Sequence, residues 1–222
     1  GAGSISGTGG LTKSGTGTLT LNTVNDYTGP TTINGGVLAI DTLGDAGTPG
    51  SIGAATSAAT NLVINGGTLR LTGLQTNTNR NLTLGASGGT LDVASSSSSM
   101  QISGVASGGG RLTKTGAGTV ILASTNTYSG GTTIDGGTIY LAGSNANKNA
   151  LGSGAVTLNN GTLTMANVQN NDVCNWNLIV PAGAAGRLNA DGRCSLNGSL
   201  TGSGTFDYYS PYVRSDLKGN WS

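Results

Sequence analysis

Residues 9–38 read GGLTKSGTGTLTLNTVNDYTGPTTINGGVL, and this stretch decides the fold. Residues 110–139 repeat it without a gap as GRLTKTGAGTVILASTNTYSGGTTIDGGTI. Equivalent residues such as Lys13 and Lys114 stand 101 positions apart (114 minus 13), and the offset is constant along both stretches. Chance rarely keeps such a register, so the sequence indicates a repeat protein.

The two stretches resemble the autotransporter-associated β-strand repeat, which runs close to G-G-L-x-K-x-G-x-G-T-L-x-L and then Y-x-G-x-T-x-I-x-x-G-x-L. The resemblance implies a right-handed parallel β-helix in an autotransporter passenger, at the bacterial cell surface (outer membrane) or secreted. It implies no reaction, so we expect a structural or adhesive, non-catalytic role. As partners we expect host or matrix glycans or proteins, and the resemblance leaves room for an anchoring domain outside this chain.

Composition limits the classes of protein that remain. The 222 residues show no composition shift that would mark a linker, so we expect one continuous domain over 1–222. Helix-forming stretches of Ala, Leu, Glu and Lys are missing, all nine acidic residues are Asp, and β-branched residues recur, which predicts an all-β chain. Charged residues make up 9% and sum to +1 without a basic patch, so nucleic acid is not an expected partner. No apolar run is long enough to insert this segment into a membrane.

The spacing of short aliphatic runs predicts the coils. The second strand of each expected pair begins at Leu69, Leu91, Leu112, Ile139, Leu163 and Leu188, with steps of 22, 21, 27, 24 and 25 residues. Runs this short bury their aliphatic side chains only when coils stack, which favours a single-stranded parallel β-helix of about nine coils. At ~4.8 Å per coil, the rod would be about 40–45 Å long. Arg70 and Asp92 each stand between two aliphatics and are therefore expected to point outward.

Asn-Gly and Asp-Gly pairs mark the corners between paired strands. Asn34–Gly35 and Asn65–Gly66 are examples, and Asp135–Gly136 takes the equivalent place in the second copy. These residues tolerate the backbone of a sharp bend. The same Asn-Gly and Asp-Gly sequences are also typical of β-hairpins, so an antiparallel β-sandwich or meander stays open as an alternative fold.

Two further features concern cross-links and turns. Cys174 and Cys194 are 20 positions apart (194 minus 174), close to one coil, so we predict a disulfide between neighbouring coils. The alternative is two buried or free thiols. Tyr27 and Tyr128 occupy equivalent places in the repeat, and we interpret them as packing residues at a turn rather than as a ligand platform.

The C-terminal segment 204–222 gathers most of the scarce aromatic residues. Tyr208, Tyr209, Tyr212 and Trp221 are the candidates for carbohydrate contact, because sugar rings stack on aromatic faces. The alternative is that these rings cover an exposed end of the solenoid. The insertion 44–61 is the longest expected loop, and we expect specificity to be added there.

Motifs for chemistry are nearly absent. The chain has no His, which removes the ordinary nucleophile triads and most zinc sites, and residues 85–89 match G-x-S-x-G without a helix or a base. We therefore expect no catalytic, cofactor-binding or metal-ligating residues and no cofactor. The alternative function is a carbohydrate-binding or polysaccharide-degrading β-helix domain. Degradation would need several Asp on one face beside an Arg, and Asp41 and Asp45 are the close pair in sequence.

Overall fold

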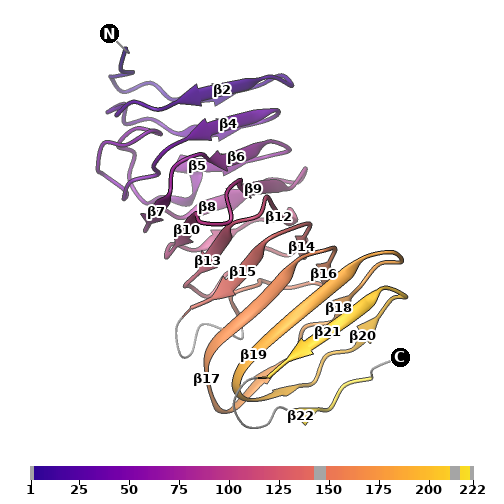
Figure 1. Ribbon diagram of the computed structural model, residues 1–222. Helices are drawn as coiled ribbons and strands as arrows, with labels where there is room; N and C mark the ends of the chain where they lie inside the picture. The colour runs from indigo at the N-terminus through magenta and orange to yellow at the C-terminus, as the bar shows by residue number, and fades with distance from the viewer. Residues whose placement is uncertain (1–2, 143–148, 211–215, 221–222) are drawn as a thin grey trace.

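The chain folds into a rod of stacked coils with its two termini at opposite ends (Figure 1). The computed structural model describes residues 3–142, 149–210 and 216–220, with the side chains of 166–172, 191–194 and 216–217 left out. Its strands form three parallel sheets that run along the rod. A short turn of 3₁₀-helix, η1 (Ala59–Asn61), precedes β5.

Each sheet takes one strand from successive coils. The five-stranded sheet contains β1 (Leu11–Lys13), β3 (Thr31–Ile33), β5 (Leu62–Ile64), β8 (Leu82–Leu84) and β11 (Ala106–Ser107). The nine-stranded sheet contains β2 (Thr18–Leu21), β4 (Val37–Ile40), β6 (Thr68–Leu71), β9 (Gly89–Val93), β12 (Leu112–Thr115), β14 (Thr132–Ile134), β16 (Val156–Leu158), β18 (Leu178–Ile179) and β20 (Leu200–Thr201). The eight-stranded sheet contains β7 (Gln75–Thr78), β10 (Ser99–Ile102), β13 (Thr119–Leu122), β15 (Thr138–Leu141), β17 (Thr162–Cys174), β19 (Ala185–Leu196), β21 (Thr205–Tyr209) and β22 (Asp216–Leu217).

The pairing confirms the parallel solenoid, and the antiparallel sandwich or meander is wrong. Every strand pair in the described part is parallel, and an isolated bridge between Asn25 and Gly50 is antiparallel. The nine strands of the largest sheet are separated by eight steps, which makes eight turns and is close to the nine coils expected. The corners bend the chain from one sheet to the next instead of closing hairpins.

Aliphatic side chains stack in register inside the rod. Leu38 in β4 pairs with Leu69 in β6, and Leu69 pairs with Leu91 in β9. All three side chains are at most 1% exposed. Burying a leucine this completely contributes roughly 1.5–3 kcal/mol, so these columns supply most of the stability of a chain that has little helix and few charges.

Arg70 points outward as expected, and its guanidinium covers the neighbouring side chain of Asp92. The two residues are register partners in β6 and β9, and Arg70 Nε donates to Asp92 Oδ2. The side chain of Asp92 is only 8% exposed, against 40% for Arg70. The carboxylate therefore stays on the outer surface of the sheet but lies beneath the guanidinium.

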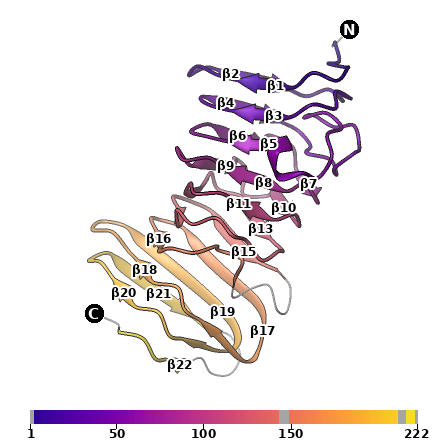
Figure 2. The ribbon, with the colours of Figure 1, turned by 180° about the vertical axis from the view of Figure 1, so that it is seen from behind.

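Equivalent strands of the two repeat copies belong to different sheets of the rod. In the first copy β1 and β3 lie in the five-stranded sheet, whereas the equivalent β12 and β14 lie in the nine-stranded sheet. From β1 the chain makes four turns to reach β11 in the same sheet, and it then moves on to the next sheet to form β12. The coils between the copies also include β7 and β10. The same repeat therefore presents its turns on different sides of the molecule (Figures 1 and 2).

A buried lysine organises the corner of each copy. Lys13 is 7% exposed and Lys114 is 0% exposed. The Nζ atom of Lys114 donates to the carbonyl oxygens of Thr115, Gly116 and Gly136 at 2.6, 2.9 and 3.3 Å. Lys13 donates to the equivalent oxygens of Ser14, Gly15 and Gly35 at 2.8, 2.9 and 3.1 Å. The repeat therefore keeps its lysine because three carbonyl groups of the bend need a donor inside the rod.

The glycine that closes this corner has no room for a side chain. Gly36 has φ of 61° and Gly137 has φ of 60°, in the left-handed region. A Cβ atom on Gly36 would lie within 2.4 Å of the Gly15 oxygen and 2.7 Å from Lys13 Nζ. Glycine here satisfies the backbone angle and lets the lysine reach the carbonyl groups.

Lys114 gives the fold a pH dependence that can be measured. Burial lowers the pKa of Lys114 from 10.5 to about 8, and nearby Asp92 acts in the opposite direction. Between these two pH values the unfolded chain holds a proton that the folded chain has released, so the free energy of unfolding rises with pH in that window. We expect the urea midpoint of the wild type to rise relative to Lys114→Met from pH 8 toward pH 10.5. A difference that falls with pH would contradict this assignment.

Tyr27 and Tyr128 are packing residues, as the sequence predicted. They are 1% and 0% exposed, and each hydroxyl lies 2.7 Å from the hydroxyl of the threonine four residues later, Thr31 or Thr132. Burial raises the pKa of Tyr128 well above its usual range. Rings held this way cannot stack on a ligand, so they fix the turn.

The insertion 44–61 is folded onto the rod by a buried arginine. Arg80 is 2% exposed, and its guanidinium donates to five main-chain oxygens of the insertion. The acceptors are Gly44 (3.2 Å), Ala55 (3.0 Å), Asp45 (3.1 Å), Thr48 (3.3 Å) and Gly53 (2.7 Å). Buried Leu43 and Ile52 complete the anchor. The insertion is therefore a pinned loop with its own core contacts, and its role in specificity stays a prediction.

The predicted disulfide also stays a prediction. Cys174 is buried at the end of β17, and the backbone register sets it opposite Leu196 and sets Cys194 opposite Asp172. The side chain of Cys194 lies outside the described part of the chain.

Candidate ligand-binding surface

The aromatic segment divides between the inside and the outside of the rod. In β21, Phe206 and Tyr208 are partly buried and pack against the core, whereas Tyr209 points outward and is 48% exposed. Tyr212 and Trp221 lie outside the described residues. Of the four predicted sugar-contact residues, the structure therefore places Tyr209 on a surface that a ligand can reach and Tyr208 on the inner side.

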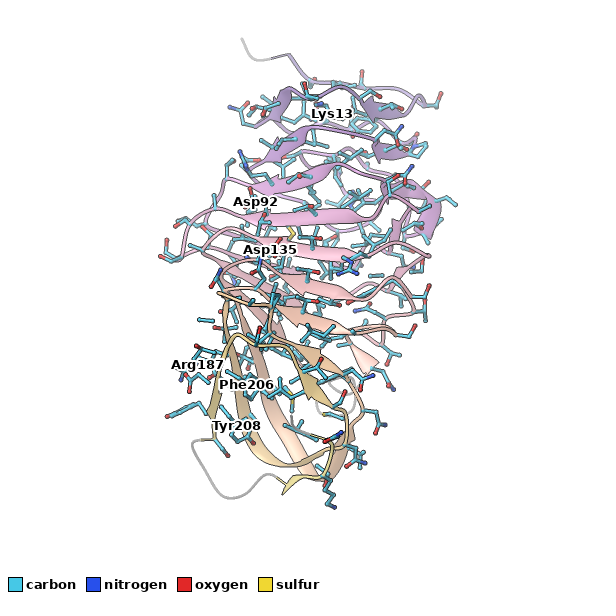
Figure 3. The ribbon with its side chains drawn as sticks, turned by 90° about the vertical axis from the view of Figure 1, so that its right-hand side faces the viewer. Lys13, Asp92, Asp135, Arg187, Phe206 and Tyr208 are labelled. Carbon is cyan, nitrogen blue, oxygen red and sulfur yellow. The ribbon has the colours of Figure 1, made fainter. Side chains whose placement is uncertain are left out.

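Arg187 in β19 lies beside Tyr209 and is held from three directions. Its Nε donates to Asn189 Oδ1 at 2.6 Å, its Nη1 lies 2.9 Å from Asp207 Oδ2, and its Cζ lies 5.0 Å from the centre of the Tyr209 ring. Asn189 Nδ2 in turn donates to Thr164 Oγ1 at 3.2 Å. Figure 3 shows Arg187 near the C-terminal end of the rod, far from Lys13.

This network orients groups more than it stabilises the fold. The side chains of Arg187 and Asp207 are 43% and 57% exposed, and ion pairs at such exposure contribute ~1 kcal/mol or less. A fixed guanidinium still offers donors to solvent in a defined direction. The cluster therefore presents donors, acceptors and an aromatic face that are already in place before a ligand arrives.

The surface extends along the rod to Tyr140, which the sequence reasoning missed. Strand register joins Tyr140 to Thr164, Thr164 to Asn189, and Asn189 to Tyr209 in one outward row of the eight-stranded sheet. Three strand steps place the two tyrosines ~14 Å apart. We define the outward row Tyr140, Thr164, Asn189 and Tyr209, together with Arg187 and Asp207, as the tyrosine face.

A signal for part of this face was present in the sequence. Tyr140 stands between Ile139 and Leu141, and both neighbours are 0% exposed, so alternation puts Tyr140 outside. The partnership of Tyr140 with Tyr209 could not be read, because three coils of unequal length separate them.

The carboxylates of the described part are dispersed rather than gathered in a reactive cluster. Five of them contact a neighbouring group of the fold: Asp41 with Ser51, Asp45 with the Asn79 amide, Asp92 with Arg70, Asp135 with Asn159, and Asp207 with Arg187. Hydrolysis or elimination of a polysaccharide needs at least two carboxyl groups, or a carboxyl and a base, converging on one bond. The arrangement instead gives each of these carboxylates a structural partner.

The G-x-S-x-G match at 85–89 lies in a shallow polar groove. The groove has a volume of about 260 Å³, and Ser87, Thr90, Arg111 and Thr113 contribute its polar side chains. The Ser87 amide donates to Asn65 Oδ1 at 3.0 Å, and the chain contains no His that could activate its hydroxyl. Among the described residues, no group of three or more Cys, Asp, Glu or His could hold a metal ion. No helix in the described part is long and apolar enough to cross a membrane.

Comparison with known proteins identifies the repeated unit. Residues 11–40 and 112–141, which contain the two lysine corners, match the family described as Passenger-associated-transport-repeat. Both stretches are similar to that repeat. A relative is the "Adhesin BmaC autotransporter" of Brucella suis biovar 1 (strain 1330), 49% identical over 127 residues. That match covers 57% of this chain and 4% of the relative, so the chain spans a small part of that protein's length. No solved structure matches the chain.

The geometry explains what the two copies of the repeat have in common. Each copy supplies four strands, two from each of two stacked coils, together with the buried lysine and a tyrosine turn. These features stabilise the stacking of coils and do not form a ligand-binding or catalytic site. The tyrosine face lies on strands that follow the second copy and begins at Tyr140 within it.

Proposed function

We propose that this chain is a rigid, non-catalytic segment of a surface-displayed or secreted passenger, and that its tyrosine face is an adhesive surface. The observation that carries the proposal is the prearranged group around Arg187, with Asn189, Asp207 and Tyr209 in contact with it on one sheet. The name of the relative, an adhesin, and the transport repeats support the display of this segment outside the cell.

The ligand class that best fits the tyrosine face is a glycan of the host surface or matrix. Sugar rings stack on exposed aromatic rings, and their hydroxyls accept from guanidinium groups and donate to carboxylates. Two tyrosines ~14 Å apart along the rod axis favour an extended chain over a single sugar. The dispersed carboxylates weigh against a polysaccharide-degrading domain.

An immobilised glycan and matrix-protein array tests the proposal with matched variants. We expect Tyr209→Ala and Tyr140→Ala each to weaken binding at least about tenfold, equivalent to about 1.4 kcal/mol. Thr157→Ala, on the outer surface of the nine-stranded sheet, is the control and should bind like the wild type. Binding that survives both tyrosine changes would remove the tyrosine face as the adhesive surface. Turnover of a polysaccharide that one Asp substitution abolishes would overturn the non-catalytic assignment.

A further inference from the structure

The chain contains four Asn-Gly pairs, and the structure treats them differently. They are Asn34–Gly35, Asn65–Gly66, Asn160–Gly161 and Asn197–Gly198. In such a pair the glycine nitrogen can attack the asparagine side-chain carbonyl, since glycine has no side chain to obstruct the approach. The attack needs a side-chain amide that can rotate, a glycine N–H that is not donated, and space for the backbone to turn.

Three of the pairs are restrained. Asn65 Oδ1 accepts from the Ser87 amide at 3.0 Å, and the Gly66 N–H donates to the Gly88 oxygen at 2.7 Å. Asn160 Oδ1 accepts from the Ala185 amide at 2.9 Å, and a Cβ on Gly161 would lie 2.3 Å from Ile134 Cγ2. Each restraint ties the amide or fills the space needed for ring closure.

The pair at Asn197 is restrained by packing. A Cβ on Gly198 would lie 1.7 Å from the Trp176 oxygen, so the backbone of Gly198 is pressed against the previous coil. Rotation of this peptide would drive it into that carbonyl group.

Asn34–Gly35 lacks all of these restraints. Asn34 is exposed, and its main-chain N–H donates to the Lys13 oxygen at 2.8 Å. Among the described residues, no hydrogen bond involves the Asn34 side chain or the Gly35 N–H. The nearest heavy atom to a Cβ on Gly35 would be 3.4 Å away, an ordinary contact distance. Lys13 Nζ still holds the Gly35 oxygen at 3.1 Å, but the two reacting groups, the Asn34 side-chain amide and the Gly35 N–H, are not restrained as they are in the other three pairs.

The second repeat shows that this corner accepts a carboxylate. Asp135 takes the place of Asn34, and its Oδ1 accepts from Asn159 Nδ2 at 2.9 Å. The register of β3 with β5 places Asn65 beside Asn34, as the register of β14 with β16 places Asn159 beside Asp135. An aspartate at position 34 would therefore meet the same kind of amide donor.

We propose that Asn34–Gly35 is a site of spontaneous modification, at which the folded protein converts Asn34 to aspartate and isoaspartate. The Gly35 nitrogen loses its proton and bonds to the Asn34 side-chain carbon, the bond to the side-chain nitrogen breaks, and ammonia leaves. Water then opens the resulting cyclic imide at either carbonyl and supplies the oxygen of the new carboxylate. The conversion adds one negative charge and takes the formal net charge of the chain from +1 to 0.

Peptide mapping by mass spectrometry tests this inference on the purified chain, incubated folded and urea-unfolded at mildly alkaline pH and body temperature. We expect the amide-to-acid mass change at Asn34 at least about tenfold faster than at Asn65, Asn160 or Asn197 in the folded protein. In the unfolded chain the four rates should converge, because the restraints are gone. Asn34→Asp should unfold at the urea concentration of the wild type. An Asn34 that stays intact in the folded chain while reacting in urea, or an Asn65 that reacts as fast, would overturn the proposal.

Discussion

Replacing Arg80 by methionine is expected to destabilise the protein by about 3–5 kcal/mol. Methionine fills similar space but donates nothing, so the main-chain oxygens of Gly44, Gly53 and Ala55 lose their donor within the fold. The insertion 44–61 should then detach from the rod while the remaining coils stay stacked. Urea unfolding followed by circular dichroism measures the loss, and limited proteolysis should show new cleavage between residues 44 and 55.

Arg187→Met is the matched control, because this arginine is exposed. Its side chain is 43% accessible, against 2% for Arg80 as a whole residue. We expect a loss of about 1 kcal/mol or less and no new cleavage in the insertion. Equal losses for the two variants would contradict the role given to Arg80.

Replacing Leu69 by aspartate is expected to prevent stable folding or to cost about 5 kcal/mol or more. Leu69 is 1% exposed and lies between its register partners Leu38 and Leu91. A carboxylate there would lie between two buried leucines in the apolar interior of the rod. Soluble yield and the urea midpoint are the measurements.

The neighbouring substitution Thr68→Asp is the control for this prediction. Thr68 belongs to the same strand but faces outward, between register partners Val37 and Thr90. We expect a change of about 0.5 kcal/mol or less in the free energy of unfolding. Comparable damage from both substitutions would show that the inside and the outside of β6 are wrongly assigned.

The sequence was sufficient for the coils because the signals were local. Alternation around Leu69 and Leu71, together with the constant offset of Lys13 and Lys114, fixes which side chains point inward and that strands stack. That the two repeat copies place their equivalent strands in different sheets could not be predicted from local signals. It depends on how many strands each intervening coil contains. β7 looks like a polar loop in the sequence, because Thr76 and Thr78 are the side chains that it turns inward.

The candidate site was predictable only in part, for a related reason. Tyr209 was found from the local aromatic composition, but Tyr140 lies 69 positions earlier (209 minus 140) and meets the same surface through three strand steps. The Arg80 anchor was missed because its partners are main-chain oxygens, which leave no residue-type signature. Lys13 and Lys114 were recognised as equivalent positions of the repeat. Their burial and their three carbonyl acceptors could not be predicted, because the acceptors are main-chain groups that come together only in the folded corner.

Nuclear Overhauser contacts between backbone protons of the isotope-labelled chain test the parallel stack most directly. The account predicts contacts of Thr113 with Thr90 on one side and with Thr133 on the other, because β12 lies between β9 and β14. Close contacts between the Hα protons of Thr32 and Val37, the signature of an antiparallel hairpin across the Asn34–Gly35 corner, would contradict it.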